Sequence, residues 1–172
     1  MFLNKIKDFI TKKIVKKRLL NVSLNASSSS IKKVGIVFDE SYFYEKEALI
    51  NELILNGIKE ENIDILVFKN AIKKNETFDY PTFSFKDISW SATFDKEEVN
   101  SFINKDFDLL ISYYDTEKSA LLLVTHSSKA SFKVGFASVD KRLNHFMIAT
   151  NAENFKVFMD ELFKYLKILN KL

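Results

Sequence analysis

Apolar residues occur along the chain in two patterns, short continuous runs and longer stretches with helical spacing. Short apolar runs rich in β-branched and aromatic residues are typical of strands that are buried on both faces. Longer stretches in which apolar residues recur every three or four positions are typical of helices. The strands are expected near residues 34–38, 63–68, 107–114, 132–136 and 146–150, and the helices near 44–56, 96–104, 117–128 and 152–170.

This alternation of strands and helices predicts an α/β fold with three layers. About five mostly parallel strands would form an open sheet, with helices on both faces, because short β–α–β connections favour right-handed parallel crossovers. Residues 70–95 are less regular and contain the single proline, Pro81. We expect an edge strand or an extended loop at 82–85, packed by Phe83, Phe85 and Trp90.

The first 24 residues have a pattern of their own. Apolar residues recur at helical spacing from Phe2 to Leu20, with lysines mostly between them. This pattern predicts a basic amphipathic helix at 1–24. The serine-rich stretch that follows has little to bury, so we expect a linker at 25–31 and a single α/β domain at 32–172.

Charge is unevenly distributed between these parts. Residues 1–20 carry seven Lys or Arg and one acid, whereas the formal net charge of the whole chain is only +3. Blocks of one sign often mark interaction segments. The predicted binding residues are therefore the basic cluster of this helix, Lys12, Lys13, Lys16, Lys17 and Arg18. The helix could pack on the domain, dock on a protein partner, or contact an anionic surface, either a membrane or RNA.

Composition excludes several kinds of chemistry. The chain has no cysteine and two histidines, so thiolate nucleophiles and sites with three imidazoles are excluded within one chain. None of the three glycines lies at a strand-to-helix turn, where a nucleotide site would need one. No catalytic residue, metal ligand or cofactor is predicted. No segment is apolar over the length needed to span a bilayer, and we expect a soluble, cytoplasmic protein.

A second candidate site follows from the expected sheet. Asp39 and Glu40 come directly after the first strand, and Asp115 follows the third long strand. Ligands of open α/β sheets bind outside the carboxyl ends of the strands, and oxygen ligands suit Mg²⁺. If these acids converge, the chain could be a small hydrolase or transferase, with or without Mg²⁺. If they do not, they are solvated loop acids.

Several strand segments together resemble a known family. The segments are Val34-Gly-Ile-Val-Phe-Asp39, Phe107-Asp-Leu-Leu-Ile111, Ser128-Lys-Ala-Ser-Phe-Lys-Val-Gly135 and Phe146-Met-Ile-Ala149. With the basic helix, they resemble a family of short proteins from the Bacteroidota that is labelled as a domain of unknown function. The resemblance implies a cytoplasmic α/β domain and an origin, but no activity. From the basic helix and the lack of a specific catalytic motif, we expect a non-enzymatic binding or adaptor domain whose basic helix docks on a partner or an anionic surface.

Overall fold

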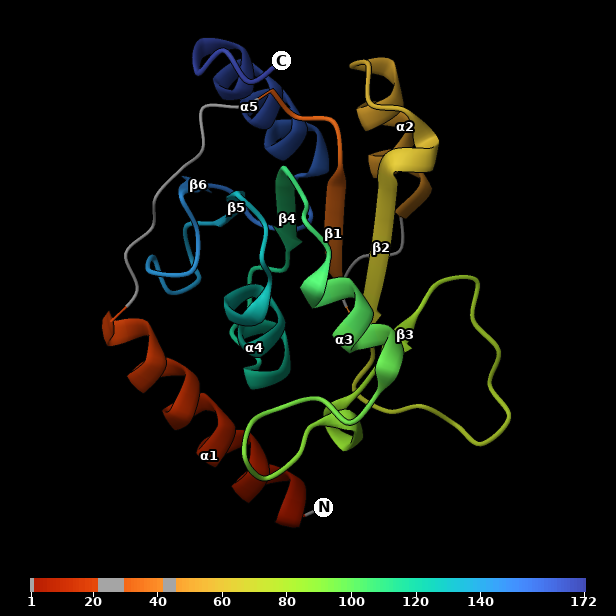
Figure 1. Cartoon of the computed structure of the whole chain (residues 1–172), viewed down its shortest axis with the longest axis vertical. Coiled ribbons are helices and arrows are strands. Elements are labelled where there is room, and N and C mark those ends of the chain that lie inside the picture. Colours follow the sequence, from red (N-terminus) through yellow and green to blue (C-terminus); the bar gives the residue numbers. More distant parts are fainter. Residues whose placement is uncertain (1, 22–29, 42–45) are drawn as a thin grey trace.

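The computed structural model describes residues 2–21, 30–41 and 46–172. Within them the strands alternate with helices as the apolar pattern predicts (Figure 1). The strands are β1 (Val34–Asp39), β2 (Ile63–Phe68), β3 (Thr82–Phe83), β4 (Leu109–Tyr113), β5 (Phe132–Phe136) and β6 (Phe146–Ile148). The helices are α1 (Phe2–Arg18), α2 (Lys46–Leu55), α3 (Glu97–Asn104), α4 (Ser119–Ser127) and α5 (Phe155–Ile168), with short 3₁₀ turns at Leu19–Asn21, Glu60–Asn62 and Phe85–Asp87.

All six strands pair in parallel, in the order β3-β2-β1-β4-β5-β6. The chain builds outward from β1 to β3, then returns to β4 on the other side of β1 and builds outward again. The α/β fold is thus confirmed, with one strand more than the five expected, because the segment at 82–83 pairs with β2 as a short edge strand. Two strands are central to this order, β1 and β4, and every residue in both is buried.

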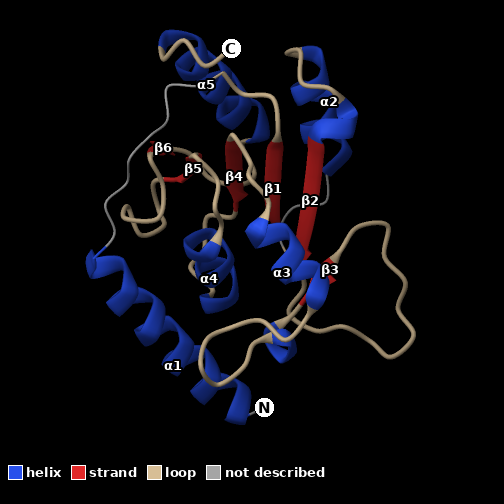
Figure 2. Cartoon of the chain, viewed as in Figure 1, coloured by secondary structure: helices blue, strands red, loops and turns tan. Residues whose placement is uncertain are grey.

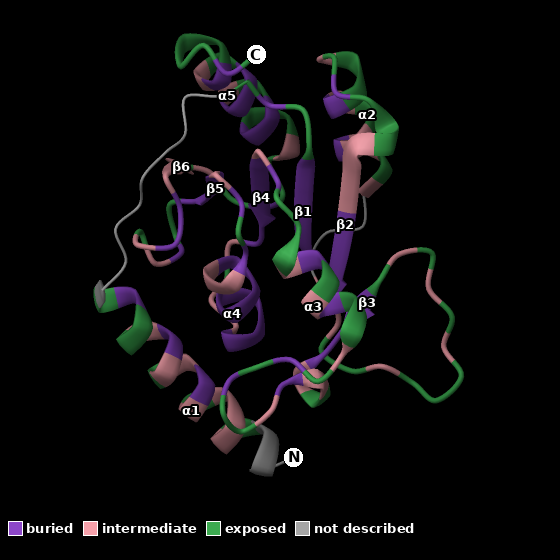
Figure 3. Ribbon diagram, in the orientation of Figure 1, coloured by how far each residue is buried: buried purple, intermediate pink, exposed green. Residues whose placement is uncertain are grey.

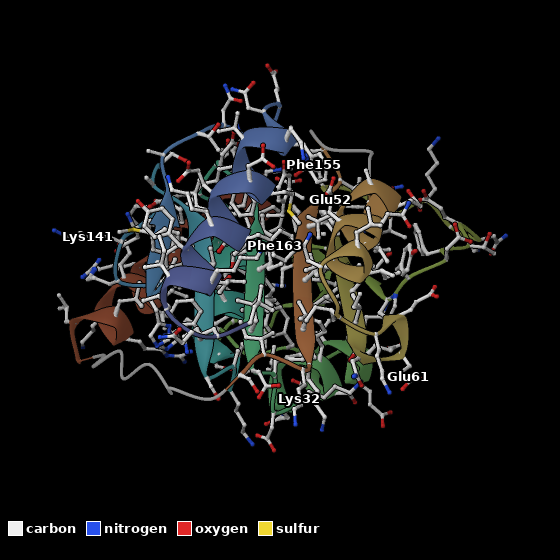
Figure 4. The ribbon with its side chains drawn as sticks, turned by 90° about the horizontal axis from the view of Figure 1, so that it is seen from above. Lys32, Glu52, Glu61, Lys141, Phe155 and Phe163 are labelled. Atoms are coloured by element: carbon white, nitrogen blue, oxygen red, sulfur yellow. The ribbon has the colours of Figure 1, made fainter. Side chains whose placement is uncertain are left out.

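The sheet has a hydrophobic core on each face. On one face, α2 and α5 cover a core that includes Leu49, Leu53, Phe158 and Leu162. Figure 4 shows these two helices on the same side of the sheet, with Phe163 of α5 lying over the strands. On the opposite face, α3, α4 and α1 cover a second core with residues such as Phe102 and Leu122. The helices therefore lie on both faces, as an open parallel sheet requires (Figure 2).

The second core depends on α1. All seven residues from Ser119 to Thr125 in α4 are buried, so this helix is covered on every side (Figure 3). A helix that is apolar all round must lie inside a protein. The sheet covers one side of α4, and α1 covers the other; Thr11 and Val15 of α1 and Leu19 of the 3₁₀ turn that follows it are all buried. The predicted linker at 25–31 falls mostly outside the described residues, and the division of the chain at 24 stays a prediction.

Replacement of Leu19 should test this role of α1. Leu19 is buried against the second core, whereas its neighbour Leu20 is 72 % exposed. We expect Leu19→Ala to lower the free energy of unfolding by about 2–4 kcal/mol, the usual cost of truncating a buried leucine. Leu20→Ala is the matched control and should change it by less than about 0.5 kcal/mol. Urea denaturation of both variants measures the difference, and equal stabilities would show that α1 is not part of the core.

Candidate functional site

The carboxyl ends of β1 and β4 meet where the strand order reverses. This position is where ligands bind in open α/β sheets, in the crevice outside the strand ends. Asp39 ends β1, and Asp115 follows the end of β4 by two residues. The predicted acids are thus brought to the same edge of the sheet. Their ion pairs and hydrogen bonds decide whether they could act together on a ligand or a metal ion.

Asp39 is paired with a lysine from a distant part of the chain. Its side chain is 2 % exposed, and its Oδ2 lies 2.6 Å from Nζ of Lys118. The backbone N–H of Ser41 donates to its Oδ1 at 3.0 Å. Lys118 also donates to Oγ of Ser41 at 3.0 Å, and the side-chain amide of Asn70 donates to the same oxygen at 2.8 Å. The Asp39 carboxylate is therefore compensated by an ammonium group.

Glu40 belongs to a different set of charges. Its carboxylate lies 3.0 Å from Nζ of Lys46 and 3.4 Å from Nζ of Lys69. Lys69 also contacts Glu76 at 2.6 Å, and this hydrogen bond raises the pKa of Lys69 and lowers the pKa of Glu76. An open cavity of about 400 Å³ lies here, lined by Glu40, Ser41, Lys69, Asn70 and Ala71. Its lining includes one acid, Glu40, and one base, Lys69.

Asp115 holds a third set of partners. Its Oδ2 accepts the backbone N–H of Ala152 at 2.8 Å, and its carbonyl oxygen accepts the hydroxyl of Ser138 at 2.7 Å. These bonds tie the end of β4 to the segments before α5 and after β5. The three predicted acids thus have separate partners. Across the described ranges, no group of three or more acids or histidines is placed to hold a metal ion.

The basic cluster of α1 is divided by the packing of the helix. Lys12 and Lys16 both lie 3.0 Å from Oε2 of Glu117, in the loop before α4. Arg18 donates to the carbonyl oxygens of Ala92 and Ser91 at 3.1 and 3.2 Å. Lys13 and Lys17 are exposed. The structure therefore gives the five predicted binding residues different roles.

The apolar side of α1 is divided as well. The spacing predicted a single apolar stripe, but its members differ in burial. Val15 and Leu19 are buried, whereas Phe9 is 69 % and Leu20 72 % exposed. Residues three or four apart share one side of a helix, so the exposed residues other than Arg18 form a single stripe, which continues into the 3₁₀ turn at Leu20. We call it the outer stripe: Lys5, Phe9, Lys13, Lys17 and Leu20.

A buried lysine lies beneath α4, and the sequence analysis did not single it out. Lys133 of β5 is 7 % exposed, and its Nζ donates to the carbonyl oxygen of Thr125 at 2.7 Å. It thus satisfies a carbonyl group near the C-terminal end of α4. Burial lowers the pKa of Lys133 to about 8. The sequence could have indicated this buried lysine, because Lys133 lies within a segment predicted to be a buried strand.

These features define a class of protein, an α/β domain with an open parallel sheet and a helix, α1, that covers the apolar helix α4. The chain belongs to the family described as Family of unknown function (DUF6913), and the match covers residues 7–169. This confirms the resemblance to a domain of unknown function, while an origin in the Bacteroidota stays a prediction. No curated protein matches the chain. No solved structure matches it either.

Lys133 should make stability rise with pH in a defined range. Its pKa falls from 10.5 to about 8 on folding, so between these values the unfolded chain binds more protons than the folded one. Stability must then increase as pH rises from 8 toward 10, by roughly 1 kcal/mol per pH unit. Lys133→Met should lack this increase. Urea denaturation at several pH values measures it, and parallel curves for the two proteins would contradict the assignment.

Loss of the Lys118 ammonium should be costly because Asp39 is buried. Lys118→Met leaves a buried carboxylate without its cation, and we expect a loss of about 3–5 kcal/mol in the free energy of unfolding. The double variant Asp39→Leu/Lys118→Met removes both charges and should recover much of this loss. Denaturant unfolding compares the three proteins. A Lys118→Met variant as stable as the native protein would show that the pair is not coupled.

Proposed function

We propose that this protein is a non-enzymatic, cytoplasmic binding domain that docks on anionic lipid surfaces through the outer stripe of α1. The observation that carries this proposal is the exposure of Phe9 and Leu20 among exposed lysines. The opposite side of the same helix is fixed on α4, and neither side chain belongs to a core of residues 2–21, 30–41 and 46–172. No helix in the described part of the chain is long and apolar enough to cross a membrane, so the contact would be peripheral.

The chemistry of the outer stripe favours lipid over RNA. Lysines bind phosphate groups of either partner. Leu20, however, is an aliphatic side chain that neither pairs with phosphate nor stacks on a base. At a bilayer surface, the same side chain gains free energy by leaving water, and so does Phe9. The combination of lysines with an aliphatic and an aromatic residue therefore fits the boundary between head groups and acyl chains.

The expected binding is reversible. Each lysine near an anionic surface contributes about 1 kcal/mol, and each large apolar side chain contributes roughly 1–2 kcal/mol when it is partly buried. Lys5, Lys13 and Lys17 with Phe9 and Leu20 then provide roughly 6 kcal/mol, which corresponds to a dissociation constant of roughly 40 μM. Such a surface would associate with membranes according to their anionic lipid content.

The enzymatic alternative has less support. It needs carboxylates that approach one another, but Asp39, Glu40 and Asp115 each have a different partner. Two of the three are compensated by lysines, which favours a structural role for these charges. A hydrolase or transferase at the strand ends stays a prediction.

Vesicle binding tests the proposed function directly. The full-length protein should co-sediment with phosphatidylcholine vesicles that contain phosphatidylserine, and not with phosphatidylcholine alone. Lys13→Ala/Lys17→Ala should weaken this binding about thirtyfold, because two lysine contacts are lost. The matched control is Lys74→Ala/Lys167→Ala, which removes the same charge from exposed positions outside α1 and should bind like the native protein.

Two outcomes would overturn the proposal. Binding of a single-stranded RNA oligomer, without binding to vesicles, would assign the outer stripe to nucleic acid. Binding to neither probe would leave the basic helix without the proposed role. Raised salt should weaken the binding to vesicles, since exposed charges are screened, but the part that Phe9 and Leu20 contribute should remain.

A further inference from the structure

Exposed apolar side chains outside α1 differ in how they are grouped. Trp90 was expected to pack at the edge of the sheet, but it is 56 % exposed, so that expectation was wrong. It lies in a turn between β3 and α3. Single exposed apolar residues are common on protein surfaces and need no partner. Helix α5 carries two such residues on one side, Val157 at 49 % and Ile168 at 62 % exposure, and a shared side is a better indication of an interface.

Val157 and Ile168 are the two ends of a stripe along α5. Glu161 and Lys164 lie between them, so that the four residues are spaced by four, three and four positions. Residues with this spacing share one side of a helix, and the same spacing forms the seam of a coiled coil. All five residues of α5 that are buried in the first core lie outside this set. We call the four residues the α5 stripe.

The α5 stripe is complementary to itself when its direction is reversed. We consider a second copy of α5 that lies antiparallel across it, with a two-fold axis midway between Glu161 and Lys164. Val157 then faces Ile168 of the second copy, and Glu161 faces Lys164 of the second copy. Each contact occurs twice, as in every two-fold interface. Apolar residues therefore meet at both ends of the stripe, and opposite charges meet in its middle.

The charges beside the stripe are complementary in the same way. Asp160 and Lys167 are exposed on one flank of the stripe, and residues of the same flank meet in an antiparallel pair of helices. Asp160 then approaches Lys167 of the second copy. With Glu161 and Lys164, the surface holds two acids and two lysines, so its charges cancel. The outer stripe of α1 instead carries lysines alone. An anionic membrane would gain little from α5, whereas a second copy meets opposite charges.

The surface continues from α5 onto the edge strand β6. A hollow of about 250 Å³ lies between them, and Glu161 of the α5 stripe lines it together with Tyr165 and residues 146–149. In the order of the described strands β6 is the last, so one of its edges pairs with none of them. Proteins usually cover or shield such an edge. A second copy on the α5 stripe would lie beside it, which enlarges the surface that two copies share.

We propose that this protein forms a two-fold dimer through an antiparallel pair of α5 helices. The inference is independent of the docking of α1, because α5 and α1 lie on opposite faces of the sheet. A dimer of this kind leaves the outer stripe of α1 uncovered. The interface consists mainly of one helix from each copy and is small, so we expect reversible dimerisation with a dissociation constant of roughly 100 μM.

Charge reversal in the middle of the stripe tests the pairing. Analytical ultracentrifugation of the full-length protein over a range of concentrations should show a monomer–dimer equilibrium. Glu161→Lys and Lys164→Glu each place like charges opposite one another and should weaken dimerisation at least about tenfold. Glu161→Lys/Lys164→Glu restores opposite charges and should dimerise like the native protein. Lys74→Glu reverses an exposed charge outside α5, and this matched control should also dimerise normally. Circular dichroism checks that each variant is folded.

Disulfide formation tests the direction of the helices, because the chain has no cysteine of its own. An equal mixture of the Val157→Cys and Ile168→Cys proteins should form a linked dimer with one protein of each kind during brief, mild oxidation. Either protein alone should not. In an antiparallel pair, the two copies of one of these positions lie about 16 Å apart along the helices, beyond the reach of a disulfide.

Three results would overturn parts or all of this inference. A native protein that stays monomeric well above the expected dissociation constant overturns the dimer. A dimer that both charge reversals leave intact overturns its placement on α5. Val157→Cys protein that links to itself as readily as to the Ile168→Cys protein overturns the antiparallel arrangement. Dimerisation that is lost on each reversal and restored by the double variant, together with the mixed disulfide, supports the proposal.

Discussion

The packing of α1 on α4 is the contact on which the rest of this structure depends. Helix α4 is buried over its whole central length, which is possible only because the sheet covers one side and α1 the other. The basic helix is therefore part of the folded body, joined to it by Val15, Leu19 and the two lysines that contact Glu117. Because one side of α1 is committed to this contact, its opposite side is available to a partner. The same contact thus stabilises the fold and orients the candidate binding surface.

Charge compensation distinguishes the strand ends from the outer stripe. At the strand ends, Asp39 and Glu40 have lysines within ion-pair distance, and Asp115 accepts a backbone N–H. The lysines of the outer stripe lie among exposed apolar side chains instead. Buried charges are retained in proteins when they are paired, and exposed charges beside apolar groups are typical of interfaces with anionic surfaces. This difference is the physical reason for placing the proposed function on α1.

The sequence predicted the framework well because burial in a parallel sheet leaves a local signal. The runs at 34–38 and 63–68 became strands almost to the residue, since both faces of each strand require apolar side chains. Contacts across long sequence distances left no such signal. The pairing of Asp39 with Lys118 joins residues 79 positions apart. Arg18 likewise binds the carbonyl groups of Ser91 and Ala92, which lie 73 and 74 positions further along the chain. Helical spacing likewise could not predict that Leu19 is buried and Leu20 exposed, because the position of α4 decides which of the two faces the core.

The separation between α1 and α4 in the sequence also bears on how the protein is made. Asp8 contacts the first residue of α4 across 111 positions of the chain. A ribosome therefore releases α1 well before it has made the helix that α1 must cover. During that interval both sides of α1 are exposed to the cell, including Val15 and Leu19. Contacts of such long range slow folding, and exposed apolar surface promotes aggregation. Lysines distributed along this early helix keep the nascent chain positively charged and so oppose its self-association until α4 is available.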